Sequence, residues 1–175
     1  MYFVSSLFDV ISLRSFSNIW YWIVLAAMWT LLTQTVMGVP VDMIGRAKRE
    51  GGQVMADVED LCRIKVLRIS AISPTSAALS VGIVSMLLSA LGVSGFVYGY
   101  ELAQAVFLLL APMALISLLT AQAAQKMIAQ NPGGAQLCDQ LHHLRLIIQG
   151  IALLSIASTA IWGMWRNLYA LTVWG

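Results

Sequence analysis

The chain has 175 residues, of which 59% are hydrophobic and only 10% are charged. A soluble domain carries about a quarter charged residues, and a domain of this size cannot bury so much apolar surface. The composition therefore excludes a soluble protein and predicts one all-α integral membrane domain over residues 1–175, whereas the net charge of +2 excludes nothing by itself.

The first segment, residues 2–13, precedes the long apolar runs. Its large apolar residues recur at helical spacing: Phe3, Leu7, Phe8 and Ile11. This pattern predicts a short helix that lies in the outer interface, where it either anchors the first span or docks against a partner. The same segment lacks the basic region and the small-residue cleavage site of a signal peptide.

Four apolar runs predict four transmembrane helices, because about 20 apolar residues in a helix cross a bilayer core. They cover about residues 19–38, 74–95, 101–120 and 145–165. Pro74 favours the first turn of the second helix. The third helix either ends near Thr120 or continues to Gln130, where the turn NPGG (131–134) separates it from the fourth.

The largest non-membrane segment, residues 39–73, lies between the first two spans. GRAKREGG (45–52) predicts a helix end and a flexible turn, and 54–69 predicts an amphipathic helix. Val58, Cys62 and Val66 share one face of this helix. The face either closes over the bundle or contacts a partner, and the helix can also lie on the inner leaflet.

The positions of the basic residues predict the orientation. Of the 10 Lys and Arg residues, eight lie in residues 39–73 or between the third and fourth spans: Arg46, Lys48, Arg49, Arg63, Lys65, Arg68, Lys126 and Arg145. Only Arg14 and Arg166 lie on the other side. By the positive-inside rule we expect a multi-pass protein of the bacterial inner membrane, with both termini on the periplasmic side.

The second predicted span carries small residues at helical spacing: Gly82, Ser85, Ser89 and Gly92. Such a stripe lets two helix backbones approach closely in lipid. It predicts a packing face, either inside the bundle, with the 145–165 span as one option, or between molecules.

The central parts of all four predicted spans contain no Asp, Glu, Lys, Arg or His. Pumps and transporters usually bring ionisable groups or broken helices to the midplane, so their absence disfavours both. No catalytic motif is recognisable either, and we expect no enzyme activity and no catalytic residue. Pro112 can kink the third predicted helix, so a small transporter gated around this kink remains an alternative function.

The stretch LCDQLHHLRL (137–146) concentrates metal-ligand types at the start of the last span. Cys138, His142 and His143 lie within six residues, and Cys62 is predicted on the same side of the membrane. A closed structural zinc site needs four ligands, and each helix face offers only two. The stretch therefore predicts the polar end of a helix, with a metal site on these four residues as the alternative.

RSFSNIWYWIVLA (14–26) and GVPVDMIGRAKR (38–49) resemble a bacterial family of small membrane proteins. That family is described as a component of the Suf iron–sulfur cluster assembly complex. The resemblance covers about the first third of the chain and carries no functional residue with it. It implies an accessory role in a larger complex.

Together these features predict a non-enzymatic accessory or scaffold subunit of an inner-membrane complex. Its contacts would be the small-residue stripe, the face of Val58, Cys62 and Val66, and the terminal segments. Expected partners are membrane lipids and other subunits or a second copy, but no nucleic acid, and no cofactor is expected. The second class is a metal- or cofactor-binding membrane protein.

Overall fold

The computed structural model describes the backbone of residues 19–174. Beyond residue 166, Leu168 is the one residue whose side chain is also described. The predicted interfacial helix over residues 2–13 lies outside the described residues. The described part confirms the all-α class. Its elements are α2 (Ile19–Gln34), β1 (Thr35–Val36), β2 (Val39–Pro40), α3 (Val41–Glu50), α4 (Gly52–Ser70), α5 (Pro74–Gly92), the π-helical turn η2 (Val93–Val97), α6 (Glu101–Gln130) and α7 (Gly134–Trp174).

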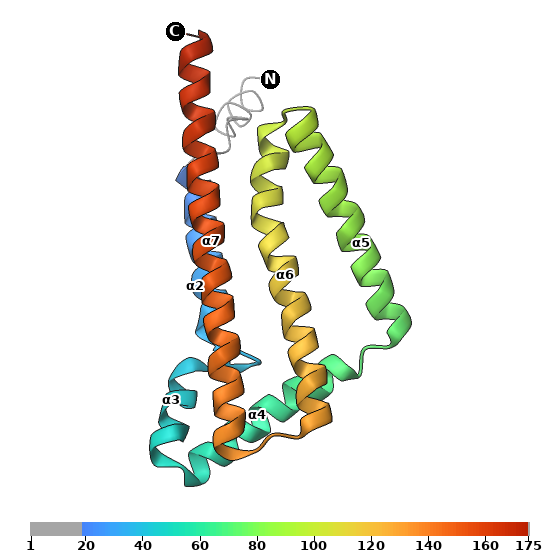
Figure 1. Ribbon diagram of the computed structural model, residues 1–175, viewed down its shortest axis with the longest axis vertical. Helices are drawn as coiled ribbons and strands as arrows, with labels where there is room; N and C mark the ends of the chain where they lie inside the picture. The colour runs from blue at the N-terminus through green and yellow to red at the C-terminus, as the bar shows by residue number, and fades with distance from the viewer. Residues whose placement is uncertain (1–18, 175) are drawn as a thin grey trace, which may run out of the picture.

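α2, α5, α6 and α7 run side by side, and α3 and α4 close one end of the bundle (Figure 1). α2 packs along α7, and α6 lies between α7 and α5. α3 and α4 cross the lower end, and α5 diverges from α6 toward that end (Figure 1). The predicted small-residue stripe therefore belongs to a helix that packs on α6, not on the 145–165 segment.

Of the described helices, three are long and apolar enough to cross a membrane: Pro74–Val97, Glu101–Gln130 and Gly134–Arg166. Each contains one predicted span. The first predicted span is apolar too, but its described helix, α2, has only 16 residues. Length and composition therefore support three of the four predicted spans.

The predicted first span is wrong at its inner boundary, because residues 35–38 leave the helix for a β-hairpin. Thr35 pairs with Pro40, and Val36 pairs with Val39. The two residues between them, Met37 and Gly38, have φ of 53° and 78°, as a tight two-residue hairpin turn requires. Val36 and Val39 are buried and fix the hairpin to the core.

The segment GRAKREGG contains the predicted helix end, which belongs to α3 (Val41–Glu50), a helix whose start was not predicted. α3 starts after Pro40, carries Asp42 in its first turn and has Lys48 and Arg49 in its last, which suits the helix dipole. The predicted turn is present at Gly51 and Gly52, whose φ values of 63° and 52° favour glycine. Two buried residues hold α3 to the core, Ile44 and Ala47.

The predicted ends of the other helices follow from local chemistry. The Ser73 side chain accepts a hydrogen bond from the Ser76 amide at 3.2 Å, and Pro74 occupies the first turn of α5. α6 takes the longer of its two predicted lengths and runs through Pro112 to Gln130. Asn131, with φ of 43°, then ends it in the left-handed conformation.

Candidate functional site at the charged end of the bundle

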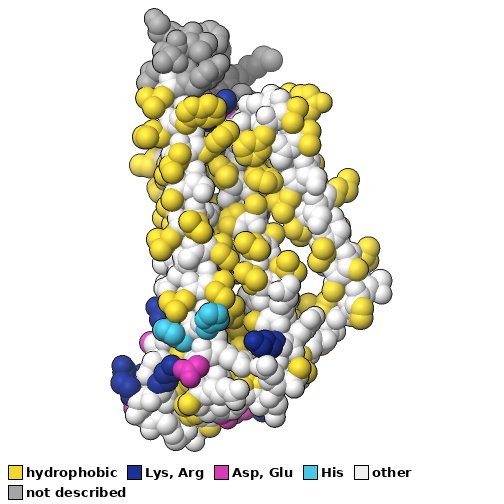
Figure 2. All heavy atoms as spheres, in the orientation of Figure 1, with side chains coloured by type: hydrophobic (Ala, Val, Ile, Leu, Met, Phe, Trp, Pro, Cys, Tyr) yellow, Lys and Arg dark blue, Asp and Glu magenta, His cyan; other side chains and the backbone are white. Residues whose placement is uncertain are grey.

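Charged and histidine side chains gather at the lower end of the molecule, and the middle of the visible face is apolar (Figure 2). The first turns of α7 enter this end and carry the stretch LCDQLHHLRL. Its apolar positions form one buried face: Leu137, Leu141, Leu144 and, one turn further, Ile148. Their spacing of four, three and four residues is that of a helix packed on one side.

Both cysteines face the core, and each meets a methionine. The Cys138 thiol lies 3.6 Å from the Met55 sulfur of α4. The Cys62 thiol of α4 lies 3.9 Å from the Met127 sulfur of α6. Cys62 and Cys138 are 2% and 0% exposed, and here they act as small apolar residues that join α4 to α6 and α7.

The two histidines lie outside the buried face of the helix. His142 and His143 are exposed, whereas Cys138 is buried. Among the described residues, no group of three or more His, Cys, Asp or Glu side chains could hold a metal ion. The structure therefore does not bring Cys62, Cys138, His142 and His143 together as a four-ligand set.

Two long-range polar contacts tie α3 and α4 to α7. The Lys48 ammonium of α3 lies 2.6 Å from the Asp139 carboxylate. The Gly134 amide donates to the Glu59 carboxylate of α4 at 2.5 Å. Sequence reasoning missed both, because neither pair has a sequence signal at such separation. The Lys48–Asp139 pair is 39% and 70% exposed, so it orients the helices and adds little stability.

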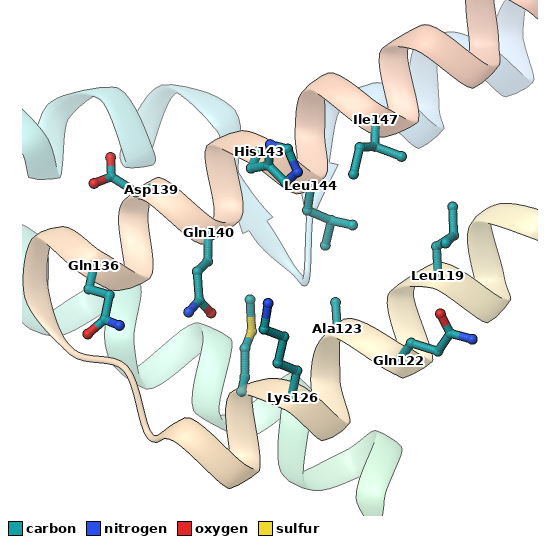
Figure 3. A pocket seen from close by; sticks show the side chains of 11 residues that line it. Leu119, Gln122, Ala123, Lys126, Gln136, Asp139, Gln140, His143, Leu144 and Ile147 are labelled. Carbon is teal, nitrogen blue, oxygen red and sulfur yellow. The ribbon is translucent and has the colours of Figure 1, made fainter.

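A groove of about 460 Å³ runs between the last turns of α6 and the first turns of α7 (Figure 3). Its size is within the range of ligand-binding sites. Side chains from both helices line it: Leu119, Gln122, Ala123, Lys126 and Met127 from α6, and Gln136, Asp139, Gln140, His143, Leu144 and Ile147 from α7. His143, which the alternative metal site included as a ligand, forms part of the wall of this groove.

The predicted contact residues of α4 are buried, whereas most of those of α5 are exposed. Val58, Cys62 and Val66 are buried against the chain's own core, so this face of α4 is not open to a partner. On α5, Gly82, Ser85 and Ser89 are exposed. Gly92 faces Phe107 of α6, whose ring lies 3.5 Å from the position of an added Cβ.

A polar contact at the opposite end joins η2, α6 and α7. The Gln104 side chain is 3% exposed and donates to the Gly95 carbonyl at 2.8 Å. Its oxygen accepts from the Trp162 indole at 3.0 Å. Sequence reasoning noted no role for Gln104, although a side-chain amide within a predicted membrane span needs such partners. These three residues join the ends of η2, α6 and α7 that lie away from α3 and α4.

The Cys62 thiol is expected to react slowly with iodoacetamide, because the thiolate is the reactive form and burial raises the pKa of this thiol. In a Cys138→Ala variant Cys62 is the single cysteine. We expect alkylation at pH 8 to be slower in the folded protein than in the denatured protein by roughly tenfold or more.

The sign of the pKa change also predicts how this rate depends on pH. A raised pKa displaces the rate profile of the folded protein to higher pH than that of the denatured protein. Mass spectrometry of the alkylated protein at several pH values measures both profiles. Equal rates in the two states would contradict the burial of Cys62.

The chain matches no protein-family model, no curated protein and no solved structure.

Proposed function

We propose that the chain is a non-enzymatic accessory or scaffold subunit of a bacterial inner-membrane complex, and that α5 contacts the neighbouring subunit or a second copy. The observation that carries the proposal is the exposure of α5 on the surface of the molecule. None of its membrane-spanning window is buried inside the molecule. The corresponding windows of α6 and α7 are each 22% buried.

The topology proposed for this role has four spans, with the charged end in the cytoplasm and both termini in the periplasm. Eight of the 10 basic residues support this orientation, since they lie near α3, α4 and the α6–α7 turn. The 16 described residues of α2 are apolar and about 24 Å long, which is most of the thickness of a bilayer core of about 30 Å. In this topology α2 is the fourth span.

The open surface of α5 has the chemistry of a helix contact in lipid. Gly82, Ser85 and Ser89 lie along one side and are exposed, and an added Cβ at Gly82 would meet nothing within 4 Å. Lipid tails are as apolar as leucine, so association depends on close packing, and small residues permit it. A partner helix could approach the α5 backbone here.

Replacing Ser85 by leucine is expected to weaken this contact, because the larger side chain holds a partner helix away from α5. Purified from native membranes in a mild detergent, the wild-type protein should bring a defined set of subunits or a second copy with it. The variant should retain about a tenth of that material or less, which corresponds to a loss of about 1.4 kcal/mol in association.

Ala90→Leu is the matched control. Ala90 is also exposed on α5, but it lies five residues further along and about 140° around the helix from Ser85. This variant should keep its partners. If both variants lose them equally, or if the wild-type protein is isolated alone and as a monomer, the proposed role of α5 is wrong.

The alternative classes have less support in the described residues. A metal protein would need Cys62 and Cys138 near His142 and His143, whereas the thiols contact methionines and the histidines are exposed. α6 remains one continuous helix through Pro112, so the described part offers no broken helix for a transport site. The resemblance to the Suf-associated family supports the accessory role, because that family is itself described as part of a complex.

A further inference from the structure

The groove between α6 and α7 changes in character along its length. Leu119 and Ile147 line the part nearer the middle of the two helices, and Ala123 and Leu144 continue this apolar wall. Lys126 lies seven residues, or about 10 Å, nearer the charged end than Leu119. The groove is therefore apolar toward the membrane core and polar where the helices leave it.

The polar part of the groove has positive character. Lys126 is exposed on α6 and extends toward α7, and among the described residues it has no ion-pair partner (Figure 3). His143 lies across from it on α7 and adds a ring nitrogen that can donate a hydrogen bond (Figure 3). An anion with an apolar tail would contact Lys126 and His143 with its charged group and the apolar wall of the groove with its tail.

The one carboxylate in the wall does not oppose such an anion. Asp139 points away from Lys126 in Figure 3, and its carboxylate is engaged by the Lys48 ammonium at 2.6 Å. The remaining polar residues of the wall are amides: Gln122, Gln136 and Gln140. Their N–H groups can donate to phosphate oxygens, although the Gln140 amide donates to Gln130 at 3.0 Å.

We propose that this groove binds one anionic phospholipid of the inner leaflet. Its phosphate contacts Lys126 and His143, and the adjacent part of one acyl chain lies along Leu119, Leu144 and Ile147. Basic pockets between transmembrane helices on the cytoplasmic side bind such headgroups. The inference depends on the inner end of the bundle facing the cytoplasm, but not on a scaffold role for α5.

The test is a lipid titration of the full chain in mild detergent, with native mass spectrometry to count bound lipids. Phosphatidylglycerol should occupy one site more tightly than phosphatidylcholine. Lys126→Gln should weaken phosphatidylglycerol about fivefold, which is the effect of one basic residue near a headgroup. Lys126→Arg should restore binding because it keeps the charge, and phosphatidylcholine should respond to neither change.

Arg68→Gln is the matched control, since it removes one exposed positive charge from α4, outside the groove. This variant should bind phosphatidylglycerol as the wild-type protein does. An equal loss with Arg68→Gln would overturn the proposal in favour of general electrostatic attraction. Equal affinity for the two lipids, or displacement of phosphatidylglycerol by millimolar inorganic phosphate, would also overturn it.

The two proposals fail separately. Loss of lipid selectivity in Lys126→Gln without loss of co-purifying subunits leaves the α5 contact intact. Loss of subunits in Ser85→Leu without a change in lipid affinity leaves the groove intact. The two residues lie on different helices, α6 and α5.

Discussion

Replacing Leu141 by alanine is expected to destabilise the protein by about 2–5 kcal/mol, the usual effect of removing a buried leucine side chain. Leu141 is 0% exposed and lies within the core that joins α3, α4, α6 and α7. A cavity would remain, because the Leu141 side chain is fully buried within this core. Unfolding in detergent, followed by the loss of tryptophan fluorescence or helical circular dichroism, measures the change.

Leu146→Ala provides the control on the same helix, since Leu146 is 53% exposed. It removes the same atoms from α7 without opening a cavity, so its effect should be within about 0.5 kcal/mol, as for most surface substitutions. If the two variants unfold alike, the closed end of the bundle is not packed as described.

Replacing Gly95 by alanine is expected to destabilise the contact between η2 and α6 by about 1–3 kcal/mol, the range for overpacking a core. An added Cβ would lie 2.9 Å from the Gln104 backbone nitrogen and 3.2 Å from the Ala103 carbonyl carbon. Backbone atoms cannot rotate away, so η2 must separate from α6. This shift would also strain the Gln104–Gly95 hydrogen bond.

Gly82→Ala makes the same substitution where an added Cβ meets nothing within 4 Å. Here alanine should leave stability unchanged or raise it by up to about 1 kcal/mol, because glycine is the poorer helix former. Opposite signs for the two variants, measured by thermal unfolding in one detergent, would establish the close approach at Gly95. Equal destabilisation would contradict it.

Local chemistry predicted the helix boundaries where a residue type dictates the backbone. Ser73 with Pro74 begins α5, and Asn131 ends α6. The hairpin at 35–40 could not be predicted in the same way, because TVMGV reads as a continuation of the apolar run. Its turn places a non-glycine residue, Met37, at positive φ, which is uncommon.

The candidate site was predicted only in part, because helical spacing places residues on a face without saying where that face ends. Cys138 and His142 are four residues apart, and a helix rotates by about 40° over that interval. That rotation is enough to leave Cys138 buried and His142 exposed. The groove and the Lys48–Asp139 pair depend on how separate helices meet, and the sequence carries no signal for either.

The end of the bundle is built from both early and late parts of the chain. α4 is complete at Ser70, but its buried face of Val58, Cys62 and Val66 belongs to a core cluster whose latest member is Ala152 of α7. A ribosome adds about 5–20 residues per second, so several seconds separate the synthesis of the two surfaces. During that interval only the earlier elements, α3 and the hairpin, can cover the apolar side of α4, and the part later covered by α6 and α7 is a target for proteases and for chaperones at the membrane.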